Sequence, residues 1–162
     1  MTKALAAAAE NYTDSAGVDP GMTAFSRHVL EVMQDVEYRL CEGGEDLEDI
    51  YRLRYDSYLQ AGMIAANASR MVVDEFDNLP NAYCYGVYYR GHLVSTVRLH
   101  HITRQTPEAP SMKVFPDILE PRVAAGETFI DPSRFAADAE WSASLRVLPY
   151  VTLRIALVAC HH

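Results

Sequence analysis

The stretch YCYGVYYRGHLVSTVRLHHI, residues 83–102, decides the fold class of this chain. Its two halves, 83–89 and 93–102, are rich in β-branched and aromatic residues, which are enriched in strands. Arg90-Gly91-His92 lies between them, and a short connection that contains glycine is typical of a tight hairpin. The sequence therefore predicts two long antiparallel strands at the centre of the fold.

Upstream of the hairpin the pattern changes from helical to extended and back. Apolar residues at helical spacing predict a helix over 23–34, and alternation of apolar and polar residues predicts a short strand over 36–40. After two glycines, Asp46 is a suitable N-cap for a second helix that runs to about residue 61. The order so far is helix, strand, helix, hairpin.

Downstream of the hairpin, residues 103–111 form a polar, proline-containing segment that predicts a loop. We expect one helical turn over 114–119, a short strand over 127–130 and a long buried helix over 142–162 with a kink at Pro149. Because no returning strand follows that helix, we expect the sequence to lack the C-terminal strands of its fold. The prediction is an α+β (α/β) domain over 23–162, after a flexible extension over 1–22.

Composition narrows the class of protein. The chain has 162 residues, 49% hydrophobic residues and a net charge of −8, which disfavours binding to nucleic acid. No stretch approaches the roughly 20 apolar residues that span a bilayer. The three cysteines form no C-x-x-C pair, which argues against a disulfide framework and a zinc site. We expect a cytoplasmic protein.

Charged residues of opposite sign recur on separate predicted elements. Asp74 and Asp77 lie just before the hairpin, while Arg54, Arg98 and Arg134 lie on a helix, a strand and a loop. An arginine within so apolar a strand needs a partner, because a lone buried charge is costly. These residues form either a functional polar cluster or a structural ion-pair network.

The segment DPSRF, residues 131–135, also allows two interpretations. Its carboxylate could act as a base or orient an amine nucleophile, but Asp, Pro and Ser are also common turn residues. His100 and His101 are neighbours on a strand and point to opposite faces, so they cannot chelate one metal together. We predict no metal site, and the sequence has no Ser-His-Asp system and no glycine-rich phosphate loop.

Four motifs in order resemble those of one family of bacterial enzymes. YRLRYDSY (51–58) resembles the R-x-x-x-F/Y helix of acyl-homoserine-lactone synthases and long-chain N-acyl amino acid synthases. DEFD (74–77) resembles their D-x-x-D element, VRL (97–99) their arginine-bearing strand and DPSRF (131–135) their acidic-x-S-R-F segment. The resemblance is to the autoinducer-synthase branch, which includes quorum-sensing enzymes, of the GNAT N-acyltransferase superfamily.

This resemblance implies a fold, a reaction and a set of site residues. The fold is a three-layer GNAT-like arrangement, with a twisted, mostly antiparallel sheet and flanking helices. The reaction moves an acyl group from a thioester to an amine, with acyl carrier protein or coenzyme A carrying the acyl group as substrate and no bound cofactor. The catalytic residues implied are Asp74, Asp77, Arg98, Asp131 and Arg134, and the substrate-binding residues are Arg54, Tyr58, Phe76, Ser133 and Phe135.

Departures from the family patterns rank the possible substrates. Residues 134–144 contain no glycine, which disfavours the pyrophosphate loop of acyl-CoA enzymes, and residues 62–73 lack the Trp of lactone-forming relatives. The leading hypothesis is therefore an N-acyl amino acid synthase that uses acyl carrier protein. A lactone synthase using S-adenosylmethionine, an acyl-CoA enzyme and a non-catalytic binding domain remain alternatives. Arg104, Arg146 and Arg154 are candidates for docking the acidic carrier protein.

Overall fold

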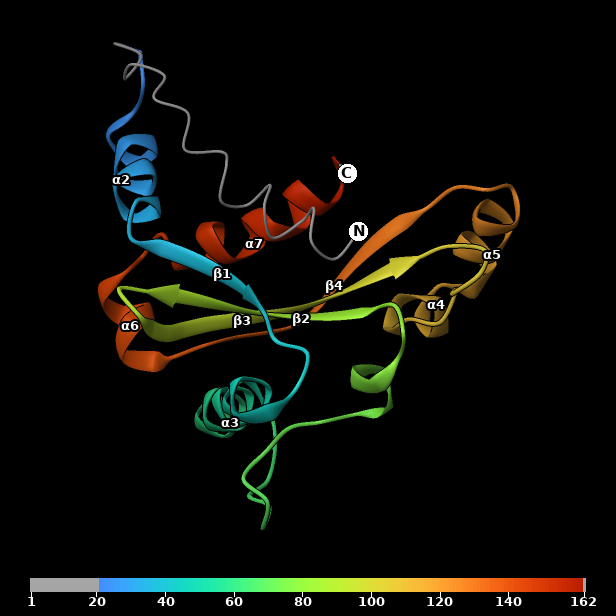
Figure 1. Ribbon diagram of the computed structural model, residues 1–162, viewed down its shortest axis with the longest axis horizontal. Helices are drawn as coiled ribbons and strands as arrows, with labels where there is room; N and C mark the ends of the chain where they lie inside the picture. The colour runs from blue at the N-terminus through green and yellow to red at the C-terminus, as the bar shows by residue number, and fades with distance from the viewer. Residues whose placement is uncertain (1–20, 162) are drawn as a thin grey trace.

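The computed structural model of the chain describes residues 21–161, and its elements carry the labels of Figure 1. The predicted extension over 1–22 lies outside the described residues except for its last two positions. Within residues 21–161, no helix is long and apolar enough to cross a membrane.

Four antiparallel strands form the central sheet in the order β1-β2-β3-β4. They are β1 (Val36–Leu40), β2 (Ala82–Tyr89), β3 (His92–Ile102) and β4 (Phe129–Ala137). The predicted hairpin is confirmed, with Tyr85 opposite Val97. Its turn is Arg90-Gly91, and both residues have positive φ, 50° and 82°, as a two-residue hairpin turn favours.

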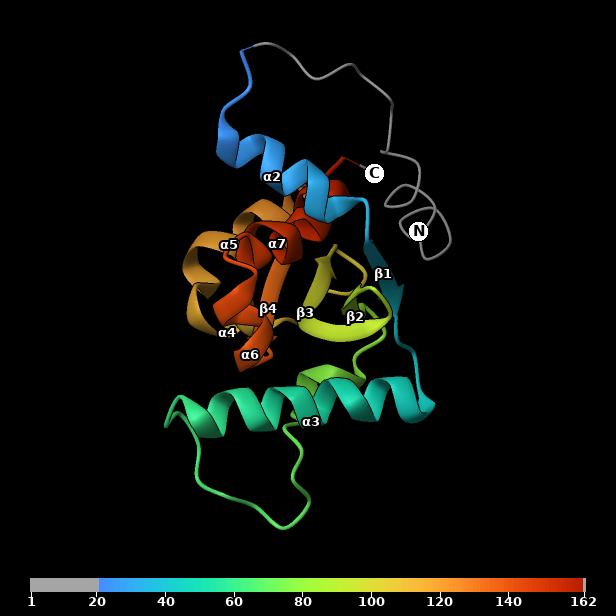
Figure 2. The ribbon, with the colours of Figure 1, turned by 90° about the vertical axis from the view of Figure 1, so that its left-hand side faces the viewer.

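Helices cover both faces of the sheet, which gives three layers (Figure 2). One face is covered by α3 (Gly44–Gln60). The other is covered by α7 (Leu148–Ala159), with α2 (Ala24–Met33) packed beside it. On that second face, Tyr85, Val97 and Leu99 form the main core with Val151 and Ile155 of α7. The α+β prediction is confirmed.

Several boundaries differ from the predictions. The helix α3 begins at Gly44, so Gly43 and not Asp46 occupies the N-cap position, and Asp46 lies in the first turn. The turn expected over 114–119 is the junction of two helices, α4 (Pro110–Val114) and α5 (Pro116–Ala124). A 3-10 helix that was not predicted, η1 (Glu75–Asn78), precedes β2.

The largest corrections lie in the last third of the chain. The strand expected over 127–130 extends to Ala137, so DPSRF is part of β4 and not a turn. Among the described strands β4 pairs with β3 alone, and an edge strand tolerates the missing N–H of Pro132. The helix expected over 142–162 is two helices, α6 (Ala139–Ser144) and α7. Pro149 occupies the first turn of α7 and causes no kink there, because first-turn N–H groups have no intrahelical partner.

Candidate active site

Within the segment Asp74–Asp77, both aspartate side chains accept hydrogen bonds from the backbone of the segment itself. Asp74 Oδ1 accepts a hydrogen bond from the Phe76 N–H at 2.9 Å, and Asp77 Oδ2 accepts one from the Asp74 N–H at 2.9 Å. This reciprocal arrangement is a capping box that starts η1. It fixes both carboxylates relative to the backbone and leaves oxygen lone pairs of each for other donors.

Asp77 receives arginines from two different elements. Arg54 of α3 donates from Nη1 to Asp77 Oδ1 at 2.8 Å, and both side chains are fully buried. Arg98 of β3 places its own Nη1 2.9 Å from the same oxygen. Arg54 Nη2 also lies 3.4 Å from the Cys84 sulfur. This carboxylate therefore joins α3, η1 and the sheet.

Asp74 binds Arg98 and a third arginine. Arg98 Nη1 donates to Asp74 Oδ1 at 2.6 Å, and Arg98 Nε donates to the Ser133 hydroxyl at 3.1 Å. Arg134 donates from Nε to Asp74 Oδ2 at 2.9 Å, and its Nη2 donates to the same oxygen. We call Arg54, Asp74, Asp77, Arg98 and Arg134 the arginine–aspartate cluster.

A local irregularity in β4 brings Arg134 into the arginine–aspartate cluster. Successive side chains of a regular strand point to opposite faces, yet Ser133 and Arg134 both contact it. Arg134 has φ of 53°, and the β3–β4 register shifts between Thr96 and Arg98. Such bulges re-aim side chains and are common beside functional sites. Arg134 is also 34% exposed, whereas the Arg54 and Arg98 side chains are buried.

The charges of the cluster set its protonation state. Burial acts to raise the pKa of Asp74, but the hydrogen bonds and charges of Arg98 and Arg134 outweigh it and hold this pKa well below its usual value. Burial acts to lower the pKa of Arg98, but the hydrogen bonds and charges of Asp74 and Asp77 outweigh it and hold this pKa above its usual value. Asp74 is therefore a carboxylate at neutral pH, and a weak base.

The other predicted site residues have more varied positions. Tyr58 donates its hydroxyl to the Phe135 carbonyl at 3.2 Å, and burial raises the pKa of that hydroxyl. The Phe76 ring centroid lies 5.8 Å from the Arg98 guanidinium and 4.5 Å from Lys113 Nζ. Asp131 accepts the Ser111 N–H at 2.9 Å at the start of α4 and forms no ion pair with the described arginines. It does not join the arginine–aspartate cluster.

Sequence reasoning missed two residues that contact the cluster or η1. Cys84 lies on β2 beside Arg54 and Asp77, and His100 binds the backbone of η1. Alternation along β3 was the available signal, because it places Thr96, Arg98 and His100 on one face. Residues 21–161 hold no group of three side chains suited to bind a metal ion.

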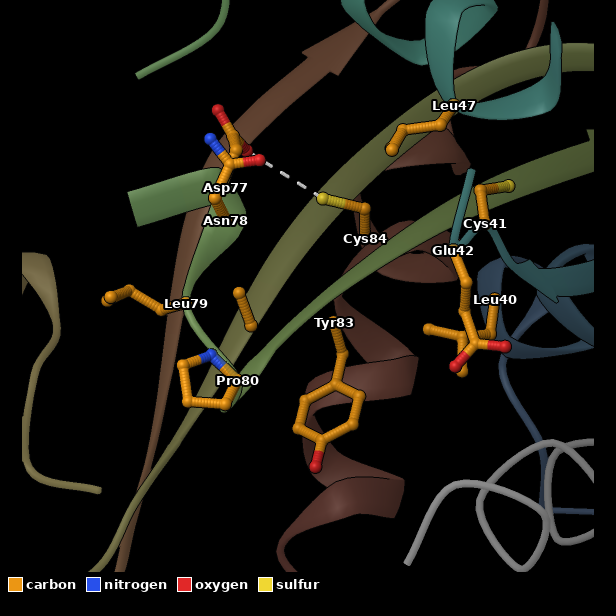
Figure 3. A pocket seen from close by; sticks show the side chains of 11 residues that line it. Leu40, Cys41, Glu42, Leu47, Asp77, Asn78, Leu79, Pro80, Tyr83 and Cys84 are labelled. Carbon is orange, nitrogen blue, oxygen red and sulfur yellow. Dashed lines mark hydrogen bonds between the residues drawn. The ribbon is translucent and has the colours of Figure 1, made fainter. Parts of the chain in front are cut away.

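Two hollows flank the cluster. The first, of about 490 Å³, lies between the end of β1 and the start of β2, and Asp77 and Cys84 line its inner wall (Figure 3). In that view the Cys84 thiol points toward the Asp77 carboxylate. The second, of about 390 Å³, is more apolar and lies beyond Phe76, beside Ala109 and Met112. Asp77 is therefore the member of the arginine–aspartate cluster that lines the first hollow, and Arg134 is the member most exposed to solvent.

Comparison with solved structures supports the fold. The chain is similar to FeeM, an N-acyl amino acid synthase from uncultured soil microbes, with a TM-score of 0.51 and 19% sequence identity. The match covers 70% of this chain and 61% of the FeeM chain, so this chain spans about three fifths of that protein. A search of curated proteins found no match.

Comparison with protein families gives the assignment. The model of the family described as N-acyl amino acid synthase FeeM matches residues 49–162, well over half of the chain. The matched region includes every residue of the arginine–aspartate cluster and the strand bulge at Arg134. The chain therefore belongs to the FeeM N-acyl amino acid synthase family.

Proposed function

We propose that this protein transfers a fatty acyl group from a carrier-protein thioester to the amine of an amino acid and so makes an N-acyl amino acid. Family membership supports the reaction class, and the arginine–aspartate cluster supplies groups suited to it. The products are an amide and a free thiol, because a C–N bond forms while the C–S bond of the thioester breaks. The amine loses one proton, and the departing sulfur takes up one proton to become the thiol.

The position of Arg134 is the observation that carries this proposal. Its Nε and Nη2 bind Asp74, so one edge of the guanidinium is held in place, and the Tyr58 hydroxyl lies beside it. Among the described residues, Nη1 makes no hydrogen bond with Asp74. It is also the arginine of the cluster with substantial solvent exposure. A guanidinium held in this way can bind a second carboxylate, and the acceptor amino acid carries one. We assign Arg134 to the carboxylate of the acceptor.

The same geometry assigns a task to Asp74. The α-ammonium group of an amino acid must lose its proton before the amine can attack a thioester. Because two arginines hold the pKa of Asp74 low, this carboxylate is a poor acceptor for the amine proton. We assign it to orienting Arg134. The outer edge of β4 has no strand partner among the described residues, so its N–H groups are candidates to stabilise the thioester oxygen.

The acyl donor is the finer part of the proposal. We favour acyl carrier protein over coenzyme A because the glycine-free segment 134–144 offers no pyrophosphate loop. Two of the candidate docking residues, Arg104 and Arg146, do not lie on one patch. Arg104 donates to the Ala124 carbonyl at the end of α5, whereas Arg146 follows α6 at the opposite end of the sheet (Figure 1).

The three unpaired cysteines suit the reducing cytoplasm, where we place the protein.

An assay of thiol release tests the donor and the acceptor together. Acyl carrier protein and coenzyme A loaded with the same acyl chain are each incubated with single amino acids or with S-adenosylmethionine. Release from the carrier protein with an amino acid supports the proposal. Release with S-adenosylmethionine alone would replace it by lactone synthesis, and release from coenzyme A alone would correct the donor. No release in any combination would refute acyl transfer by this chain.

A further inference from the structure

His100 lies directly beneath η1. It is two residues beyond Arg98 on β3, and alternation along the strand places both side chains on the face covered by α3. Its side chain is fully buried, and Nε2 lies 3.0 Å from the carbonyl oxygen of Phe76. The imidazole also meets the Phe76 ring edge-on, with centroids 6.1 Å apart and planes at 84°.

This contact identifies the tautomer of His100. A carbonyl oxygen can only accept, so Nε2 must carry the hydrogen. In the neutral ring Nδ1 is then an acceptor, and it is buried with no hydrogen-bond partner among the described residues. A second proton would place an N–H donor there with nothing to receive it, at a cost in free energy. The neutral ring with Nε2 protonated therefore fits this position.

The surroundings of the ring also favour the neutral state of His100, chiefly through burial. Burial lowers the pKa of His100, and the charge of Arg98 on the same strand lowers it further. The Phe76 carbonyl and the carboxylates of Asp131 on β4 and Asp77 on η1 act in the opposite direction, but burial dominates. His100 is neutral at physiological pH.

The contact matters because of where Phe76 lies. It stands between Asp74 and Asp77 in a helix of only four residues. Arg98 holds the two carboxylates, while His100 holds the backbone between them, and both side chains project from one central strand. We infer that His100 is a positioning residue of the proposed acyl transfer: it holds η1 in the register that lets Asp74 orient Arg134. The inference rests on the proposed function for its catalytic consequence and on the hydrogen bond for its geometry.

Two substitutions separate the hydrogen bond from the ring. His100→Gln keeps an N–H donor that can reach the Phe76 carbonyl but cannot titrate, whereas His100→Leu removes the donor. We expect His100→Leu to lower kcat/KM for the amino acid by about 10²-fold, as misplacement of site residues by about 1 Å can do, and His100→Gln to restore most of it. His101→Gln is the matched control, because His101 points to the other face of β3 and should leave kcat/KM unchanged.

The pH profile provides a readout that a purely structural role would not change. The attacking amine must be neutral in every variant, so log(kcat/KM) falls with unit slope as the pH drops below the pKa of the amine. In the unaltered protein the slope should steepen to two at lower pH, where protonation of His100 places an unsatisfied N–H donor at the buried Nδ1 and displaces the ring from η1. The His100→Gln variant should keep unit slope throughout.

Nitrogen NMR of ¹⁵N-histidine-labelled protein tests the geometry without any substrate. His100, assigned by its absence from His100→Gln, should show a protonated Nε2 and an unprotonated Nδ1 at pH 7. The opposite tautomer, or full turnover by a folded His100→Leu variant, would overturn the inference. If the unaltered protein turns over no acyl thioester, the proposed function fails, and the NMR result still decides whether His100 anchors η1.

Discussion

Arg54 of α3 and Asp77 of η1 form an ion pair, 2.8 Å between Nη1 and Oδ1, in which both side chains are completely removed from solvent. Removing one partner of such a pair leaves an uncompensated charge in a medium of low dielectric. Since Asp77 also binds Arg98, the loss would reach the sheet as well as the helix. The pair therefore connects the stability of the domain to the shape of the candidate site.

We predict that Arg54→Leu lowers the free energy of unfolding by about 3–5 kcal/mol, the range for breaking a buried ion pair. The comparison variant is Arg52→Leu, two residues away on the exposed side of the same helix. Arg52 binds Glu48 and Asp49 at the surface, where ion pairs contribute about 1 kcal/mol or less. Urea denaturation followed by circular dichroism measures both. Equal losses in the two variants would show that the buried pair has no special structural role.

The lowered pKa of Asp74 predicts that the free energy of unfolding depends on pH. Its pKa is lower in the folded protein than in the unfolded chain, so its contribution is present above the unfolded pKa of about 3.9 and is lost as pH falls from there toward the folded value. Asp74→Asn removes this contribution. The variant should therefore be less stable than the unaltered protein at pH 7, with the difference shrinking below pH of about 4. Urea denaturation from neutral to acidic pH measures it, and a difference independent of pH would contradict the assignment.

The assignment of Arg134 to the acceptor carboxylate predicts that this residue distinguishes an amino acid from its amide. Arg134→Lys keeps the charge but loses the planar group that contacts Asp74 through two nitrogens. We expect KM for the amino acid to rise at least about tenfold, since a hydrogen bond between charged groups contributes about 1.5–3 kcal/mol. KM for the corresponding amino acid amide, which has no carboxylate, should change little.

The control for this prediction is Arg122→Lys. Arg122 binds Glu127 at the surface of α5 and contacts no member of the arginine–aspartate cluster. Its substitution should leave both KM values unchanged. An equal effect of Arg134→Lys on the amino acid and on its amide would exclude Arg134 as the carboxylate-binding group.

The hydrogen bond of Tyr58 predicts that removing its hydroxyl lowers stability and leaves the chemical step unchanged. Its hydroxyl donates to the Phe135 carbonyl and so ties α3 to β4 next to Arg134. Tyr58→Phe should lower the free energy of unfolding by about 1 kcal/mol, the usual contribution of one hydrogen bond, while turnover at saturating substrate is retained. Thermal unfolding and the acyl-transfer assay measure the two effects. A large fall in kcat in a stable variant would instead place the hydroxyl at the reacting groups.

The central fold was predictable because its signals are local. Runs rich in β-branched and aromatic residues and a glycine turn define β2 and β3, and helical spacing defines α2 and α3. The last third was not predictable in the same way. Pro132 and Ser133 resemble a turn, and only their pairing with β3 shows that an edge strand tolerates them. The break between α6 and α7 likewise follows from packing of Leu145 and Leu148 into the main core.

The five charged residues of the arginine–aspartate cluster were predictable from the sequence, but their arrangement was not. Arg54, Arg98 and Arg134 come together with Asp74 and Asp77 as the family motifs imply. Asp131 does not join them, because its short side chain caps the start of α4. Positive φ at Arg134 has no sequence signal, since non-glycine residues rarely adopt it. His100 was missed because its contact is to a backbone carbonyl, which no motif records.

The most direct test of the proposed acyl transfer follows the nitrogen atom of the acceptor amino acid into the product. The protein is incubated with acyl carrier protein loaded with a fatty acyl chain and with a ¹⁵N-labelled amino acid, and products are analysed by mass spectrometry. We predict an N-acyl amino acid that carries the label, formed by the unaltered protein and much more slowly, at low amino acid concentration, by a folded Asp74→Asn variant. Absence of labelled amide from every acyl thioester, or undiminished formation by Asp74→Asn, would contradict it.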